Sequence, residues 1–76
     1  MRKELKWFAG EMEKKLQLHD GDRGSEGWAG DPFEDLLQQI TRRCNRIRAR
    51  EGNDISNCID IANFAMMIAD NCHREE

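Results

Sequence analysis

The chain has few residues that favour β-strands and no apolar run long enough to cross a membrane. Its 76 residues include no valine and no tyrosine, one threonine and six isoleucines. Because β-branched and aromatic residues are the main strand formers, an extensive sheet is not expected. No apolar run approaches the ~18 residues of a membrane span, and no apolar signal segment follows the first residues. These absences predict an all-α, soluble protein of the cytoplasm.

Cysteine is present in an odd number and without metal-binding spacing. The three cysteines are Cys44, Cys58 and Cys72, and no two of them form a Cys-x-x-Cys pair. A disulfide framework needs an even count and an oxidising compartment, so free thiols in a reducing compartment are expected. The same spacing gives no zinc site, and we expect no cofactor.

The chain is short for a protein that must build its own core. It has a mass of 8.9 kDa, a formal net charge of −3, and 36% charged residues. A domain of this size hides only ~60% of the surface that its unfolded chain exposes. Such domains often need a partner to complete the core, and a second copy is the simplest one. We therefore expect a homodimer.

Helical periodicity marks three segments, at about residues 2–18, 32–51 and 54–73. The first carries an amphipathic stripe and the second a narrow apolar seam, with apolar residues three and four apart. The stripe comprises Leu5, Phe8, Met12 and Leu16, and the seam comprises Phe33, Leu37, Ile40, Cys44 and Ile47. The third segment is apolar over more than half of its circumference, which predicts a central helix.

The connections between these segments predict how the helices are arranged. Residues 19–31 contain four glycines and are expected to form a loop. Gly52 favours the end of the second helix, and Asn53 or Asp54 favours the start of the third. So short a connection forces an antiparallel hairpin. The prediction is a small helical bundle, an N-terminal helix plus a hairpin, that dimerisation through the third helix completes.

Two polar features stand out on the last two helices. Five arginines lie between residues 42 and 50. They form either a solvated basic face or a site for phosphate or an acidic protein, because guanidinium offers paired donors to such oxygens. On the third helix, Asn57, Asp60 and Asn63 form a polar stripe. A carboxylate on an apolar helix is costly unless it is paired, so Asp60 is expected to have a partner, an arginine of the second helix or a ligand.

The chain resembles one known family over nearly its whole length. Residues 60–70, Asp-Ile-Ala-Asn-Phe-Ala-Met-Met-Ile-Ala-Asp, are similar to the last helix of short MazG-like nucleotide pyrophosphohydrolases, all-α enzymes frequent in phage genomes. Residues 5–16 resemble their first helix, and Leu36-Leu37 the start of their second. Residues 23–28, Arg-Gly-Ser-Glu-Gly-Trp, resemble their Lys-Gly-Gly-Trp loop with an insertion.

The resemblance also implies that the enzyme's metal site is lost. Family members hold Mg²⁺ with Glu-Glu-x-x-Glu on one helix and Glu-x-x-Asp on the next. In this chain, the glutamate positions are occupied by Arg42, Arg43, Arg46 and Asn57, and Asp60 is the only remaining candidate ligand. Guanidinium does not bind Mg²⁺ and repels it, so the usual hydrolysis is not expected.

Three functions follow as hypotheses. The first is a catalytically degenerate, phage-derived MazG-like protein that binds a nucleotide or phosphate at the former metal site. Its expected ligand-binding residues are Arg42, Arg43, Arg46, Asn57, Asp60, Asn63 and Trp28, the last as a stacking platform unless it only plugs the bundle. The second is a small anti-defence inhibitor, similar to an anti-CRISPR protein, that binds a host protein complex. The third is residual metal-dependent pyrophosphohydrolysis that relies on Asp60. Nucleic acid is a weaker partner for an acidic chain.

Overall fold

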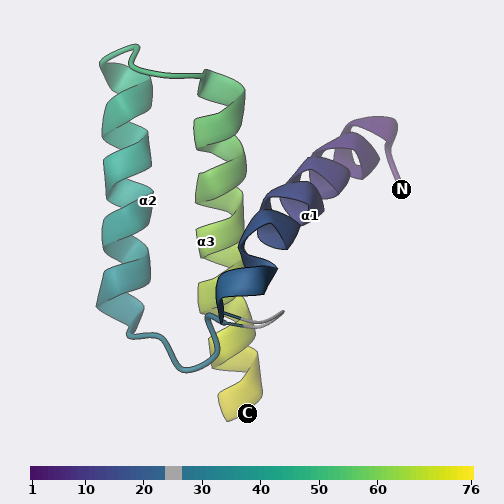
Figure 1. The fold of residues 1–76 in the computed structure, drawn as a ribbon, viewed down its shortest axis with the longest axis vertical. Helices are drawn as coiled ribbons and strands as arrows, with labels where there is room; N and C mark the ends of the chain where they lie inside the picture. The colour runs from purple at the N-terminus through teal and green to yellow at the C-terminus, as the bar shows by residue number, and fades with distance from the viewer. Residues whose placement is uncertain (24–26) are drawn as a thin grey trace.

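Three helices make up the fold of this computed structural model, which describes residues 1–23 and 27–76. They are α1 (Lys3–Arg23), α2 (Phe33–Arg48) and α3 (Asp54–Glu75), and the described residues form no strand. Figure 1 shows α2 and α3 side by side and antiparallel, while α1 crosses α3 and its N-terminal end points away from the hairpin. The all-α class and the hairpin are therefore confirmed.

Helix α2 ends earlier than predicted, and Gly52 is not the residue that ends it. The last helical residue is Arg48, and Arg50 takes the left-handed conformation with φ 58°. The amide of Arg50 donates to the carbonyl of Ile47 at 3.2 Å, and the amide of Glu51 donates to the carbonyl of Arg46 at 2.9 Å. These two bonds form a Schellman motif, which needs its left-handed residue at Arg50.

Helix α3 begins as the sequence predicts. The side-chain oxygen of Asn53 accepts a hydrogen bond from the amide of Ser56 at 3.0 Å, which identifies Asn53 as the N-cap. Between the two helices, Gly52 has a φ of 74°, a conformation that suits glycine. The tight turn sets the antiparallel register of α2 and α3.

Helix α1 is longer than predicted, because residues 19–23 continue it instead of starting a loop. His19 lies three residues after Leu16 and on the same side of the helix. Both side chains line the cavity beside α3 described below, so this contact favours helix despite Gly21. Gly24, one of the four glycines of the predicted loop, lies outside the described residues.

The core is thin and centres on α3. Among the described residues, the buried apolar side chains are Leu36 and Ile59, which are 5% and 4% exposed. Helix α3 packs against both other helices, which confirms its central position. None of the helices over residues 1–23 and 27–76 combines the length and apolar character that a membrane crossing requires.

Candidate functional site

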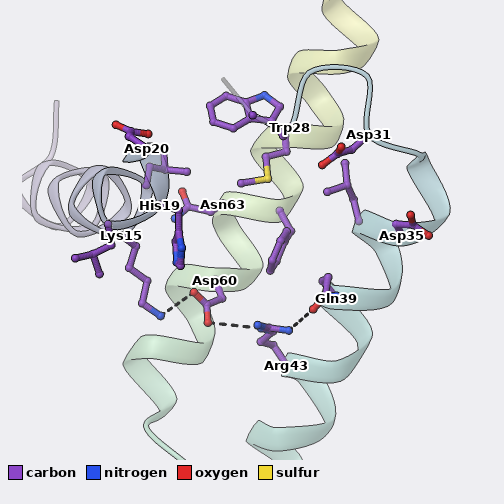
Figure 2. Close-up of a pocket in the computed structure, with 16 residues that line it drawn as sticks. Lys15, His19, Asp20, Trp28, Asp31, Asp35, Gln39, Arg43, Asp60 and Asn63 are labelled. Atoms are coloured by element: carbon purple, nitrogen blue, oxygen red, sulfur yellow. Dashed lines mark hydrogen bonds and ion pairs between the residues drawn. The ribbon is translucent and has the colours of Figure 1, made fainter. Parts of the chain in front are cut away.

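A cavity of about 730 Å³ lies where α1, α2, α3 and the segment before α2 meet (Figure 2). This volume falls within the range of small-ligand sites in proteins. Its apolar lining includes Trp28, Leu36, Phe64 and Met67. Its polar lining comprises Lys15, His19, Asp20, Asp31, Asp35, Gln39, Arg43, Asp60 and Asn63. The cavity therefore combines an aromatic wall with polar groups from every element.

A chain of ion pairs crosses one end of the cavity, with Asp60 at its centre (Figure 2). Lys15 Nζ lies 2.7 Å from Asp60 Oδ1, and Arg43 Nε lies 3.5 Å from Asp60 Oδ2. The arginine partner expected for Asp60 is thus present, and a lysine of α1 accompanies it. Each of the three side chains is less than one-third exposed, so the pairing is poorly screened by solvent.

Arg43 is held in place from three sides. Besides Asp60, its Nη1 donates to Oε1 of Gln39 one turn earlier on α2. Its guanidinium carbon lies 5.2 Å from the centroid of the Phe64 ring, a cation–π distance. These contacts hold the guanidinium against α3, although its buried Nε has no hydrogen-bond partner among the described residues.

Asn63 brings a buried amide to the cavity. Its side chain is 5% exposed, and its Nδ2 donates to the backbone carbonyl of Met12 at 3.2 Å. Its Oδ1 is buried and finds no hydrogen-bond partner among the described residues. A buried acceptor without a donor is costly, so a donor from a ligand or a water molecule is the expected complement.

Trp28 closes the opposite end of the cavity and is tied to the last turns of α3. Its Nε1 donates to Asp70 Oδ2 at 2.9 Å, and its carbonyl accepts from Asn71 Nδ2 at 3.1 Å. The amide of Gly30 donates to Asn71 Oδ1 at 3.2 Å. These bonds position the indole as part of the cavity wall, which suits both the plug and the stacking role expected for it.

The bonds to Asp70 predict a pH dependence for the Trp28 segment. The hydrogen bond from Arg74, followed by that from Trp28, holds the pKa of Asp70 below its ordinary value. A lowered folded-state pKa adds stability that is complete above the ordinary aspartate pKa of about 3.9 and is lost as pH falls through the folded-state value. We expect Trp28 fluorescence, read in a Trp7→Phe background, to change only below about pH 4.

The matched variant for this titration is Asp70→Asn. The asparagine cannot lose a charge in this range, so the acid transition should disappear while the helical circular dichroism signal stays unchanged at neutral pH. An identical fluorescence transition in Asp70→Asn would assign it to another group.

Three predicted site residues lie outside the cavity lining. Arg42 and Arg46 are exposed on α2. Asn57 is 5% exposed, and its Nδ2 donates to the carbonyl of Glu51 at 3.2 Å, so its amide stabilises the α2–α3 turn. The structure therefore brings together Arg43, Asp60, Asn63 and Trp28 from the predicted set.

Sequence reasoning missed the contributions of α1 and of the aspartates. Lys15 and His19 lie one helical turn apart beside the apolar stripe, a spacing that signals polar groups at the edge of a packed face. The missed aspartates are Asp20, Asp31 and Asp35. Nothing in their local sequence separates them from the surface carboxylates of a chain with 15 acidic residues.

The charge of the cavity lining differs from that of an arginine-lined phosphate site. Among the described residues, four carboxylates and two cations line it, and with His19 neutral these carry a formal charge of −2. Figure 2 places Asp60 between Lys15 and Arg43, with Asp20, Asp31 and Asp35 nearer the Trp28 end. The described part of the chain holds no group of three or more His, Cys, Asp or Glu side chains placed to share a metal ion.

Comparisons with known proteins identify no relative of this chain. No protein-family model, curated protein or solved structure matches the chain.

Proposed function

We propose that the chain is a catalytically degenerate MazG-like protein that binds a nucleoside or nucleotide in this cavity without hydrolysing it. The observation that carries the proposal is the buried Asn63 Oδ1, an unpartnered acceptor at a cavity of about 730 Å³ that Trp28 and Phe64 also line. A nucleobase matches these groups, because it offers N–H donors at its edge and flat faces for aromatic contact.

The ion-pair chain supports binding without hydrolysis. Asp60, the carboxylate that the resemblance leaves as the last candidate ligand, is engaged by Lys15 and Arg43. A metal at this carboxylate would have to displace or approach both cations, which repel it. The same two cations serve better to orient a ribose or a single phosphate at that end of the cavity.

The charge of the lining indicates which part of a nucleotide dominates recognition. The described lining residues carry a formal charge of −2, which disfavours a triphosphate because a triphosphate carries several negative charges. The exposed Arg42 and Arg46 lie outside the cavity lining and do not offset this charge inside it. We therefore propose that the base and sugar provide most of the affinity, and the phosphates little of it.

Titration calorimetry tests this proposal. Separate titrations into the protein use four nucleosides, adenosine, guanosine, cytidine and thymidine, and each of the corresponding triphosphates. At least one nucleoside should saturate one site per chain and bind no more weakly than its triphosphate. Asn63→Ala should weaken that nucleoside roughly tenfold, the effect of one lost hydrogen bond. Asn45→Ala, an exposed position on α2, is the matched control and should leave the affinity unchanged.

Two outcomes would contradict the proposal. One is that no nucleoside or nucleotide saturates the protein at millimolar concentration. The other is pyrophosphate release from a triphosphate in the presence of Mg²⁺ or Mn²⁺ that Asp60→Asn abolishes, which would restore the enzymatic alternative.

A further inference from the structure

Helix α2 lies at the edge of the bundle, and one side of it is uncovered. It packs against α3, and Figure 1 shows α1 on the opposite side of α3. At about 100° per residue, the side of α2 turned away from Leu36 and Ile47 is a continuous exposed strip of about three turns. This strip, here called the outer face of α2, comprises Gln38, Thr41, Arg42, Asn45, Arg46 and Arg48.

The outer face carries a charge opposite to that of the whole chain. The chain has a formal net charge of −3, but residues 36–50 hold five arginines and none of its 15 acidic residues. The side chains of Arg42 and Arg46 form no hydrogen bond or ion pair with any described residue. On α2 itself, Glu34 and Asp35 lie in the first turn, before the outer face begins. The outer face is therefore a surface of uncompensated positive charge.

Helix stability does not account for these arginines. The helix dipole favours cations near the C-terminus, but the effect falls off within the last turn. That turn contains Arg46 and Arg48, whereas Arg42 lies before it. Arg42 and Arg46 are also one turn apart, a spacing at which like charges destabilise a helix. Positive charge that costs stability, and has no partner among the described residues, points to an anionic partner outside the chain.

The outer face lacks the groups that a protein or a single nucleic-acid strand would use. Protein interfaces depend on a few aromatic and aliphatic anchors in a buried centre. Single strands are bound by stacking their bases on aromatic side chains. Residues 34–50, all of them described, contain no aromatic residue and expose no large apolar side chain. A polar, arginine-rich face is instead typical of contacts with duplex phosphates.

We propose that the outer face of α2 binds double-stranded DNA, with the helix in the major groove and its arginines on the phosphates. A helix with its side chains is about 10–12 Å across, and the major groove is about 12 Å wide. Arg42 and Arg46 lie along one edge of the outer face. Arg48, which donates to Asn45 at 3.3 Å, lies along the other. The arginines thus flank the amide and hydroxyl groups that hydrogen-bond to base edges, those of Gln38, Thr41 and Asn45.

The DNA site is separate from the cavity proposed to bind a nucleoside. Arg42, Arg46 and Arg48 are not among the residues that line the cavity. DNA binding and nucleoside binding are therefore independent, and the failure of one leaves the other standing. In Arg46→Gln, the affinity for a nucleoside should equal that of the wild type.

Fluorescence anisotropy with a labelled DNA duplex of about 20 base pairs, or two helical turns, tests the proposal. The wild-type protein should bind with a Kd of ~100 μM or tighter at near-physiological salt. The logarithm of the association constant should fall against the logarithm of the salt concentration with a slope of about −2.7, since each of three phosphate contacts adds about −0.9. Arg46→Gln should bind more weakly, and its slope should be about −1.8.

The matched control is Arg2→Gln, which removes the same charge from an exposed position before α1. The N-terminal end of α1 points away from the hairpin (Figure 1), so this variant should keep the slope of the wild type. Circular dichroism should show that both variants are as helical as the wild type.

Four results would overturn the proposal. The first is no binding of the duplex even at about 50 mM salt, where phosphate contacts are strong. The second is an equal slope in Arg46→Gln and Arg2→Gln, which would place the contact elsewhere. The third is equally tight binding of single-stranded DNA or of an RNA duplex, whose major groove is too narrow for side chains to read. The fourth is displacement of the duplex by poly-glutamate at equal charge, which would assign the outer face to an acidic protein.

Discussion

Replacing Asp60 by asparagine is expected to lower the free energy of unfolding by about 2–3 kcal/mol. The variant leaves Lys15 and Arg43 close together around a neutral amide. Removing one partner of a fully buried ion pair costs ~3–5 kcal/mol, because an uncompensated charge remains. The three side chains are 19–29% exposed, so water screens part of this cost. Thermal unfolding should shift downward by roughly 10–20 °C in a chain of this length.

The control for this prediction lies on the same helix. Asp54 pairs with Arg50 at 3.1 Å, but the two side chains are 47% and 81% exposed. Exposed pairs contribute ~0.2–1 kcal/mol, so Asp54→Asn should cost at most about 1 kcal/mol. Denaturant unfolding measures both variants. Equal losses in Asp60→Asn and Asp54→Asn would mean that the ion-pair chain does not hold α1 against the hairpin.

The hairpin was predictable because its signals are local. The apolar seam of α2, the short connection and the Asn53 cap all act within a few residues. The end of α1 was not predictable in the same way, because Gly21 argues locally against helix and the contacts of His19 with the cavity argue for it. Those contacts depend on a helix that lies far along the chain, so the local signal gave the wrong boundary.

The polar residues of the site were likewise predictable only where the signal was local. Asp60 was expected to pair with an arginine because an isolated carboxylate on an apolar helix is costly, and Arg43 fulfils that expectation. Lys15 was missed because it lies 45 residues from Asp60 and α1 has no fixed position until the bundle forms. Asn57 and Asn63 look alike in sequence. Asn57 stabilises the nearby α2–α3 turn, whereas Asn63 faces the cavity and donates to the carbonyl of Met12 on α1.

Asn63→Asp is expected to destabilise the fold by roughly 3 kcal/mol at pH 7, although it changes the side-chain volume very little. The carboxylate loses the amide hydrogen that Asn63 donates to the carbonyl of Met12. It also places a charge at a position that is 5% exposed. Both effects penalise the ionised form, and Asp60, one turn earlier on α3, adds repulsion.

The pH dependence of this variant separates a buried charge from a simple packing defect. Burial raises the folded-state pKa of the new carboxyl above its ordinary value, so the penalty exists only where the unfolded chain is ionised. The gap in unfolding free energy between Asn63→Asp and the wild type should therefore shrink as pH falls from 7 toward 4. The exposed Asn45→Asp variant should differ from the wild type by about 0.5 kcal/mol or less. A gap for Asn63→Asp that stays constant with pH would mean that the cost is a packing or hydrogen-bond defect and not the burial of a charge.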